Sequence, residues 1–254
     1  MKSPFFAAAF AAAALVASAN STNDLLTVGS DVERPTLSAG INYRTMKIER
    51  GQVENDESVF GYEVELEWYG LFGGIESCND LTGVNGRRGR YNEIESRFGY
   101  GRSFGDFTAR TAYVYKKCVL EEADTQEVEI ELEYETPWVT PFLELACDTH
   151  DKAGAFYGAF GLEREWQLTD GLTAVANGGI GFGNAYRNDA DFESEKLAFR
   201  EMHLGTALEI ELCPHVKLVP GIDFYDYFTR AQRRTYDKFN GFVAVAGCYL
   251  TVEF

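Results

Sequence analysis

Carboxylates at every second position are the residues of this chain with the clearest chemical potential. The stretch "GYEVELEWYG" (61–70) alternates glutamate with apolar or aromatic residues, and "VEIELEYE" (128–135) repeats the arrangement. Rows of ionised carboxylates attract cations wherever water reaches them. Unpaired carboxylates stacked in a dry core would be too costly. Both rows therefore need either water or basic partners.

Other groups that could do chemistry lack the context that such chemistry needs. The run "GGIGFG" (178–183) superficially suggests a phosphate-binding loop, but we expect no helix after it, and small residues at a bend or room in an interior explain it better. The acidic segments "VENDE" and "NDADFESE" lack the spacing of a calcium loop and are interpreted as solvated loops. No CxxC or CxxH spacing supports zinc, and the odd number of cysteines, five, leaves at least one thiol free or paired between chains. We predict neither a metal nor a cofactor.

The start of the 254-residue chain is typical of an exported protein. Lys2 gives a positive beginning, an apolar run follows to Val16, and Ala17-Ser18-Ala19 is a small-residue cleavage site. Residues 1–19 are therefore predicted to be a secretory signal peptide. Its removal takes one of 23 basic side chains and none of 40 acidic ones, which leaves a net charge of −18. That charge disfavours nucleic acid as a partner, and no later apolar run could form a spanning helix.

The elements that must position the carboxylates are strands. Period-two alternation continues almost to the last residue, whereas helical periodicity is scarce after the signal. We predict twelve strands, at 35–47, 58–68, 70–78, 91–103, 107–118, 126–136, 138–148, 154–167, 171–186, 198–212, 215–229 and 241–254.

Tight and long connections alternate between these strands. The tight ones lie around Tyr69-Gly70, 103–106, 136–138, 168–171 and 212–215, and the others are mostly longer and polar. In an antiparallel meander this pattern places all tight turns at one end, as in a transmembrane β-barrel. The predicted fold is all-β: a closed antiparallel up-and-down transmembrane barrel of about twelve strands over 35–254, after a periplasmic tail at 20–34. Both chain ends should be periplasmic, with 48–57, 79–90, 119–126, 187–197 and 230–240 outside.

The two faces of each strand can be assigned from the alternation. Residues predicted to face lipid are Leu37, Ala39, Ile41, Tyr43, Tyr62, Val64, Leu66, Trp68, Val128, Ile130, Leu132, Tyr134, Met202, Leu204, Leu208, Ile210, Val216, Leu218, Ile222 and Phe224. Charges in hydrocarbon cost a few kcal/mol near the midplane, so the alternate residues must face the lumen. The predicted lumen-lining residues are Glu63, Glu65, Glu67, Glu93, Glu95, Arg97, Arg110, Lys116, Glu129, Glu131, Glu133, Glu144, Glu163, Glu165, His203, Glu209, Glu211, Lys217 and Asp223.

Basic residues are few on this inward face. The strand at 107–118 carries Arg110 and Lys116 and lies between two acid-rich strands, where opposite charges across strands are favourable. These bases cannot neutralise all the inward acids. Water in the lumen must solvate the remainder.

The chain ends "FVAVAGCYLTVEF", with an aromatic last residue. Leu250, Val252 and Phe254 resemble the C-terminal strand of Gram-negative outer-membrane proteins, whose final aromatic helps the barrel-assembly machinery to recognise them. The layout also resembles the TorF-like porin family: "YRTMKIERGQ" is similar to its first strand and basic-glycine turn, "YGLFGGIESCND" to its third strand, and "SFGDFTARTAYVYKK" to its short turn and tyrosine-rich fifth strand.

The resemblance implies a membrane channel in the outer membrane of a Gram-negative bacterium. Such a protein is exported through the Sec pathway and meets outer-membrane lipid, lipopolysaccharide, the assembly machinery and small solutes. A homo-oligomer is one option for its assembly.

Two non-enzymatic functions remain open. One is a porin-like channel for passive diffusion of small solutes, weakly cation-selective through an acidic lumen. The alternative is a plugged structural or surface-interaction barrel without transport. Twelve strands leave a wider interior than eight, and the loops are short for an adhesin, which favours the channel.

Enzymatic activity is not expected. A barrel phospholipase needs Ser and His together on the lipid-facing surface, and no histidine here has that placement. His150 lies beside Asp148 and Asp151 in a loop, where acid-rich sequence makes an Asp–His pairing common by chance, and His215 lies in a tight turn.

Overall fold

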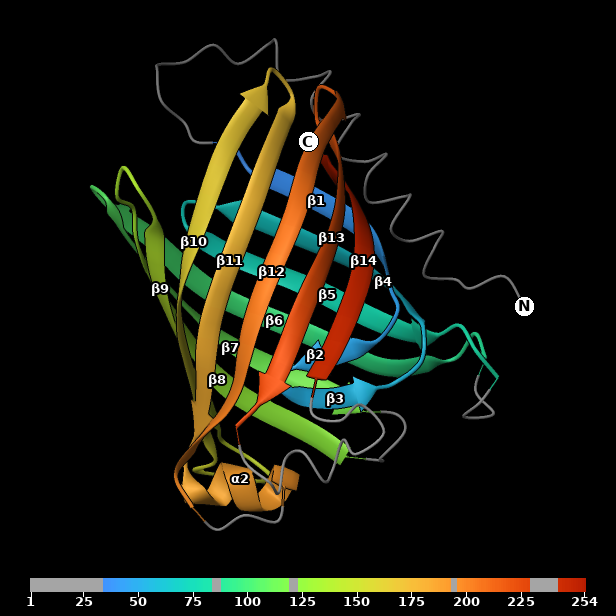
Figure 1. Cartoon of the computed structure of the whole chain (residues 1–254), viewed down its shortest axis with the longest axis vertical. Coiled ribbons are helices and arrows are strands. Elements are labelled where there is room, and N and C mark those ends of the chain that lie inside the picture. The colour runs from blue at the N-terminus through green and yellow to red at the C-terminus, as the bar shows by residue number, and fades with distance from the viewer. Residues whose placement is uncertain (1–33, 84–87, 119–122, 193–195, 229–241) are drawn as a thin grey trace.

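The computed structural model of the chain describes residues 34–83, 88–118, 123–192, 196–228 and 242–254. The predicted signal peptide and nearly all of the predicted tail lie outside these ranges. The described residues form one closed barrel of antiparallel strands (Figure 1).

Twelve strands close the barrel, in the order β1, β14, β13 and so on down to β4, which pairs with β1. They are β1 (Thr36–Arg44), β4 (Val59–Trp68), β5 (Leu71–Asp80), β6 (Tyr91–Phe104), β7 (Phe107–Cys118), β8 (Ala123–Tyr134), β9 (Thr140–Asp148), β10 (Phe156–Thr169), β11 (Leu172–Gly183), β12 (Ala198–Cys213), β13 (Val216–Tyr227) and β14 (Phe242–Glu253). The predicted fold class and strand number are confirmed. The first strand ends at Arg44 and not at 47, and the predicted strand at 171–186 ends at Gly183.

The tight turns follow from backbone chemistry. Between β4 and β5, Tyr69 and Gly70 have φ angles of 53° and 76°. Positive φ at both central residues is the two-residue hairpin geometry whose twist matches that of the flanking strands. The pairing of β4 with β5 therefore continues up to the turn, where Trp68 pairs with Leu71.

The apolar residues of the alternating strands point away from the barrel interior. Leu66, Trp68, Phe98 and Leu204 are 48%, 51%, 64% and 55% exposed. Exposed apolar residues on this scale mark a surface that contacts something other than water. None of the described helices is long and apolar enough to cross a membrane.

Two elements were not predicted from the sequence. Strands β2 (Lys47–Glu49) and β3 (Gln52–Asn55) form a hairpin between β1 and β4, and helix α2 (Ala185–Phe192) follows β11. Figure 1 shows both at the end of the barrel opposite the C-terminus. The expectation that no helix follows "GGIGFG" was therefore wrong.

The hairpin also corrects the interpretation of 48–57 as a loop, whereas its location on the outer side of the membrane stays a prediction. Lys47, Gly51 and Asn55 are buried, and Arg50 contacts the wall strands β8 and β9. The segment lies within the mouth of the barrel because its charged side chains have charged partners there.

Candidate functional site

Cavities inside the barrel are bordered by the acid ladders. One, of about 280 Å³, is bordered by Glu63, Glu65, Arg97, Arg110, Glu129 and Glu131. A second, of about 450 Å³, is bordered by Glu95, Glu144 and His203 as well as by hairpin residues. Glu67 borders a third at the tight-turn end. The interior is thus a polar space and not a packed apolar core.

The remaining predicted lumen residues lie around the same interior. Glu93 and Lys116 border a smaller cavity beneath the hairpin. Glu163 interacts electrostatically with Glu133, Glu165 and Glu209. Asp223 lies against the backbone of Gly205, and Glu211 against that of Gly171.

Two lysines form ion pairs with the carboxylates beneath the hairpin. Lys47 Nζ lies 2.8 Å from Glu54 and also binds Glu93, while Lys116 Nζ binds Glu49 and lies 3.7 Å from Glu95. Oxygens of Glu49, Glu93 and Glu95 come close enough together to hold a metal ion. Because the two ammonium groups already lie among them, this cluster is an ion-pair network.

Electrostatics fix the charge state of the hairpin carboxylate in this network. Burial alone would raise the pKa of Glu49, but Lys116, Lys47 and Arg50 outweigh it and hold that pKa well below its usual range. Glu49 is therefore ionised at neutral pH, and the hairpin is attached by full charges.

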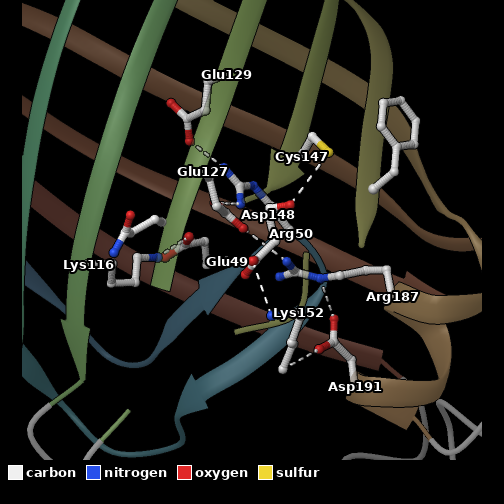
Figure 2. A network of polar contacts seen from close by, with 12 residues as sticks. Glu49, Arg50, Lys116, Glu127, Glu129, Cys147, Asp148, Lys152, Arg187 and Asp191 are labelled. Carbon is white, nitrogen blue, oxygen red and sulfur yellow. Dashed lines mark hydrogen bonds and ion pairs between the residues drawn. The ribbon is translucent and has the colours of Figure 1, made fainter. Parts of the chain in front are cut away.

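Arg50 attaches the hairpin tip to the opposite wall (Figure 2). Its guanidinium binds Glu127 and Glu129 of β8, and its Nε lies 3.5 Å from Glu144 of β9. Burial alone would lower the pKa of Arg50, but Glu127 and the other carboxylates raise it well above its usual value. The tip carries a permanent positive charge bound to three acids.

Helix α2 extends the same network. Arg187 lies 3.0 Å from Glu127 and 2.8 Å from Asp191, and Arg200 of β12 lies 2.8 Å from Asp191. Burial would raise the pKa of Asp191, but Arg187 and Arg200 outweigh it and lower that pKa. Hairpin, helix and wall are thus joined through shared ion pairs, as Figure 2 shows.

An apolar cluster holds the base of the hairpin. Met46, Phe192, Tyr227, Val243 and Val245 are buried together, with Ile48 and Val53 of the hairpin against them. Burial of apolar surface contributes about 25 cal/mol per Å². The base is therefore attached to β13 and β14 by packing, and the tip to β8 and β9 by charge.

A strand irregularity brings two charged residues into the interior side by side. The β11–β12 register shifts between Ile180 and Phe182, and both Arg200 and Glu201 are buried. Such a bulge redirects side chains that strict alternation would send to opposite faces. A Cβ atom on Gly181 would collide with Glu201, so the glycine-rich run provides room for this pair.

Charge pairing is unequal along the barrel. At the tight-turn end, Arg110 lies 3.5 Å from Glu65 and Lys217 lies 3.5 Å from Glu209. Among the described residues, Glu133, Glu163 and Glu165 have no ion-pair partner. A smaller share of the acids is therefore paired with a base at this end of the lumen than at the hairpin end.

The histidines show no catalytic arrangement. His150 Nδ1 lies 3.9 Å from Asp151 at the surface, and Asp148 Oδ1 accepts hydrogen bonds from the backbone of His150 and Lys152 instead of orienting the imidazole. The His203 ring lies 6.1 Å from that of Tyr225 in the lumen.

Sequence reasoning missed several residues of the interior: Arg44, Glu76, Tyr157, Arg187, Arg200 and Glu201. It also missed the role of Arg50, although "KIERGQVEN" contains a signal. Alternation on both sides of a basic-glycine pair is the pattern of a short hairpin, and Arg50 and Gly51 do have φ angles of 48° and 72°.

The closed sheet and polar interior define a barrel of porin-like architecture. The KdgM porin aligns with 8% identity and a TM-score of 0.52 over 85% of this chain and 98% of its own. A KdgM porin in complex with disordered oligogalacturonate aligns with 7% identity and a TM-score of 0.50 over 86% of this chain and 98% of its own. The NanC porin aligns with 10% identity and a TM-score of 0.49 over 86% of this chain and 98% of its own. No family profile and no curated protein matches the chain. The two KdgM structures agree with this chain in fold; the TorF-like resemblance gains no support from them.

Proposed function

We propose that the chain is an outer-membrane, porin-like channel for passive diffusion of small solutes, with weak selectivity for cations. The observation that carries this proposal is the combination of an exposed apolar outer face with acid-bordered cavities of about 280 and 450 Å³ inside a closed sheet. Lipid contact accounts for the first and a water path for the second.

The sign of the selectivity comes from the unpaired acids. Carboxylates with pKa values of about 4 are ionised at neutral pH when water reaches them, and rings of acids favour cations. Oligogalacturonate, the ligand of one KdgM structure, is a polyanion. An acid-rich lumen disfavours such a solute, so we do not extend that ligand to this chain.

The plugged scaffold remains a second candidate because the hairpin narrows the mouth. Planar-bilayer recording under a KCl gradient separates the two functions. A channel of this kind gives a reversal potential with the cation sign, which shrinks as salt screens the lumen. Anion preference would contradict the assignment of the acids to the lumen, and the absence of conductance would favour the scaffold.

A further inference from the structure

The barrel wall contains a guanidinium-binding arrangement that the chain itself fills. The Nη1, Nη2 and Nε atoms of Arg50 face Glu127, Glu129 and Glu144 in turn, so each nitrogen of the planar group has its own carboxylate. The Tyr157 ring centroid lies 5.7 Å from Arg50 Cζ. Carboxylates placed opposite each nitrogen of a planar group, together with an aromatic ring, favour binding of a guanidinium over an ammonium group.

Glu201 provides a further acceptor that Arg50 does not use. It is 2% exposed, and its Oε1 accepts a hydrogen bond of 2.8 Å from the Tyr157 hydroxyl. Its Oε2 has no hydrogen-bond partner among the described residues, since Arg200 Nε is 3.9 Å away. Glu201 borders the same cavity of about 450 Å³ as Arg50 and Tyr157. A buried acceptor facing a cavity indicates a ligand with N–H donors.

Part of the pocket is held in place by contacts that do not involve Arg50. Glu127 stays attached to Arg187 at 3.0 Å, and Tyr157 to Glu201. The hairpin base is held by the cluster around Met46, and Glu49 is held by Lys47 and Lys116, so that a movement of the tip is confined to Arg50 and Gly51. The contacts with Arg187 and Tyr157 keep Glu127 and Glu201 in place when Arg50 leaves. Glu129 and Glu144, whose ion pairs among the described residues are with Arg50, then take the guanidinium of the solute as their partner.

We propose that the pocket of Glu127, Glu129, Glu144, Tyr157 and Glu201 binds small solutes that carry a guanidinium group, in competition with Arg50. A bound solute displaces the hairpin tip from the wall and widens the passage. The binding step is independent of the proposed function, and only the widening rests on it.

Binding is tested by titration calorimetry of the full chain in detergent. Agmatine is the probe, and 1,5-diaminopentane is the control of equal charge and similar length. Arg50→Ala should bind agmatine about tenfold more tightly than the wild type, because the internal competitor is gone. Glu129→Gln in that background should lose most of the gain. Arg110→Ala removes a lumenal guanidinium beside Glu65 and should bind agmatine like the wild type.

Equal agmatine affinity of Arg50→Ala and the wild type would overturn the proposal, as would equal affinity of Arg50→Ala for agmatine and 1,5-diaminopentane. Heat-modifiable electrophoretic mobility checks that each variant folds. If Arg50→Ala does not fold, Arg50→Lys replaces it. Lysine keeps the charge but lacks the fork, so a smaller gain in the same direction is expected.

Conductance separates this inference from the proposed function. Agmatine should raise the conductance of the wild type by displacing Arg50, and lower that of Arg50→Ala by occupying a passage that is already open. Absence of conductance in every variant, with the expected binding differences intact, would contradict the channel and leave the pocket supported.

Discussion

Three acids at the tight-turn end, which have no ion-pair partner in the part of the chain that the structure describes, should set the ion selectivity. Glu133, Glu163 and Glu165 face one interior, and Glu163 interacts with both others. Their joint replacement by glutamine removes three negative charges and changes side-chain volume little. We expect the ratio of K⁺ to Cl⁻ permeability to fall while the barrel stays folded.

The size of the effect follows from Coulomb's law and screening. For an ion about 10 Å from each carboxylate, one charge contributes about 0.4 kcal/mol in water. Screening at 0.1 M salt reduces this to about 0.15 kcal/mol. Three carboxylates then separate a cation from an anion by about 0.9 kcal/mol, or roughly fourfold in permeability ratio. At 1 M salt the Debye length of about 3 Å leaves only about a 1.2-fold effect.

Reversal potentials in planar bilayers at both salt concentrations measure this change. A matched control, Asp106→Asn with Glu135→Gln and Asp170→Asn, removes three charges from exposed positions at or beside the tight turns. This control should change the ratio of K⁺ to Cl⁻ permeability less than the triple replacement in the lumen does. The reasoning is refuted if the lumen triple leaves the ratio at 0.1 M salt unchanged, or if its effect persists undiminished at 1 M.

Other perturbations test assembly, topology, the hairpin and the helix. Deletion of Phe254, whose backbone pairs with Leu37, should lower outer-membrane yield without affecting signal cleavage; an unchanged yield across expression levels would contradict its role in recognition. Protease added to intact cells should cut within 79–90, 119–126 and 230–240 and spare 47–55, whereas cleavage confined to 103–106 and 168–171 would reverse the topology. Gly51→Ala should raise conductance, because Gly51 has φ of 72° and a Cβ there would meet Glu201; an unchanged conductance would show that the hairpin does not limit the passage. Asp191→Asn should destabilise the fold by about 3 kcal/mol, which thermal unfolding measures, since among the described residues Arg200 then keeps only Glu201 at 3.9 Å and Arg187 keeps only Glu127 as an ion-pair partner. Because the pKa of Asp191 is lowered, its contribution is complete above the unfolded value of about 4 and is lost only as pH falls through the lowered pKa. Hydrogen exchange of 185–192 should thus stay slow at pH 5, and loss of protection there would contradict the ion-pair assignment.

The strands could be predicted from the sequence because a barrel wall has two unlike faces. A face in contact with lipid needs apolar residues, and a face in contact with water can hold charged ones. Apolar and charged residues alternate along most of β4 and β8, so the sequence shows which face of the strand points outward. Glu76 lies in "GGIESCND", where glycines interrupt the alternation, and its inward direction was missed for that reason.

The hairpin and the bulge could not be predicted in the same way. Polar residues at 47–55 are equally compatible with bulk water and with a polar lumen, and hydropathy does not distinguish these environments. The distinction depends on Glu127 and Glu144, which are far away in sequence. Arg200 and Glu201 are adjacent, so a strict period of two assigns them to opposite faces, whereas the register shift in β12 turns both inward.

Water access explains why the acids of the two halves of the lumen differ in ion pairing. Where hairpin and helix exclude water, an unpaired carboxylate would be prohibitively costly, and Glu49 and Asp191 accordingly have lysine or arginine partners. Where the barrel is open at the tight-turn end, water can solvate Glu133 and Glu163 without a base. Most acids of the hairpin half are therefore paired with bases, whereas Glu133, Glu163 and Glu165 have no ion-pair partner among the described residues. Discrimination between cations and anions should arise mainly at the tight-turn end. Exclusion of large solutes and binding of guanidinium groups should arise at the hairpin end.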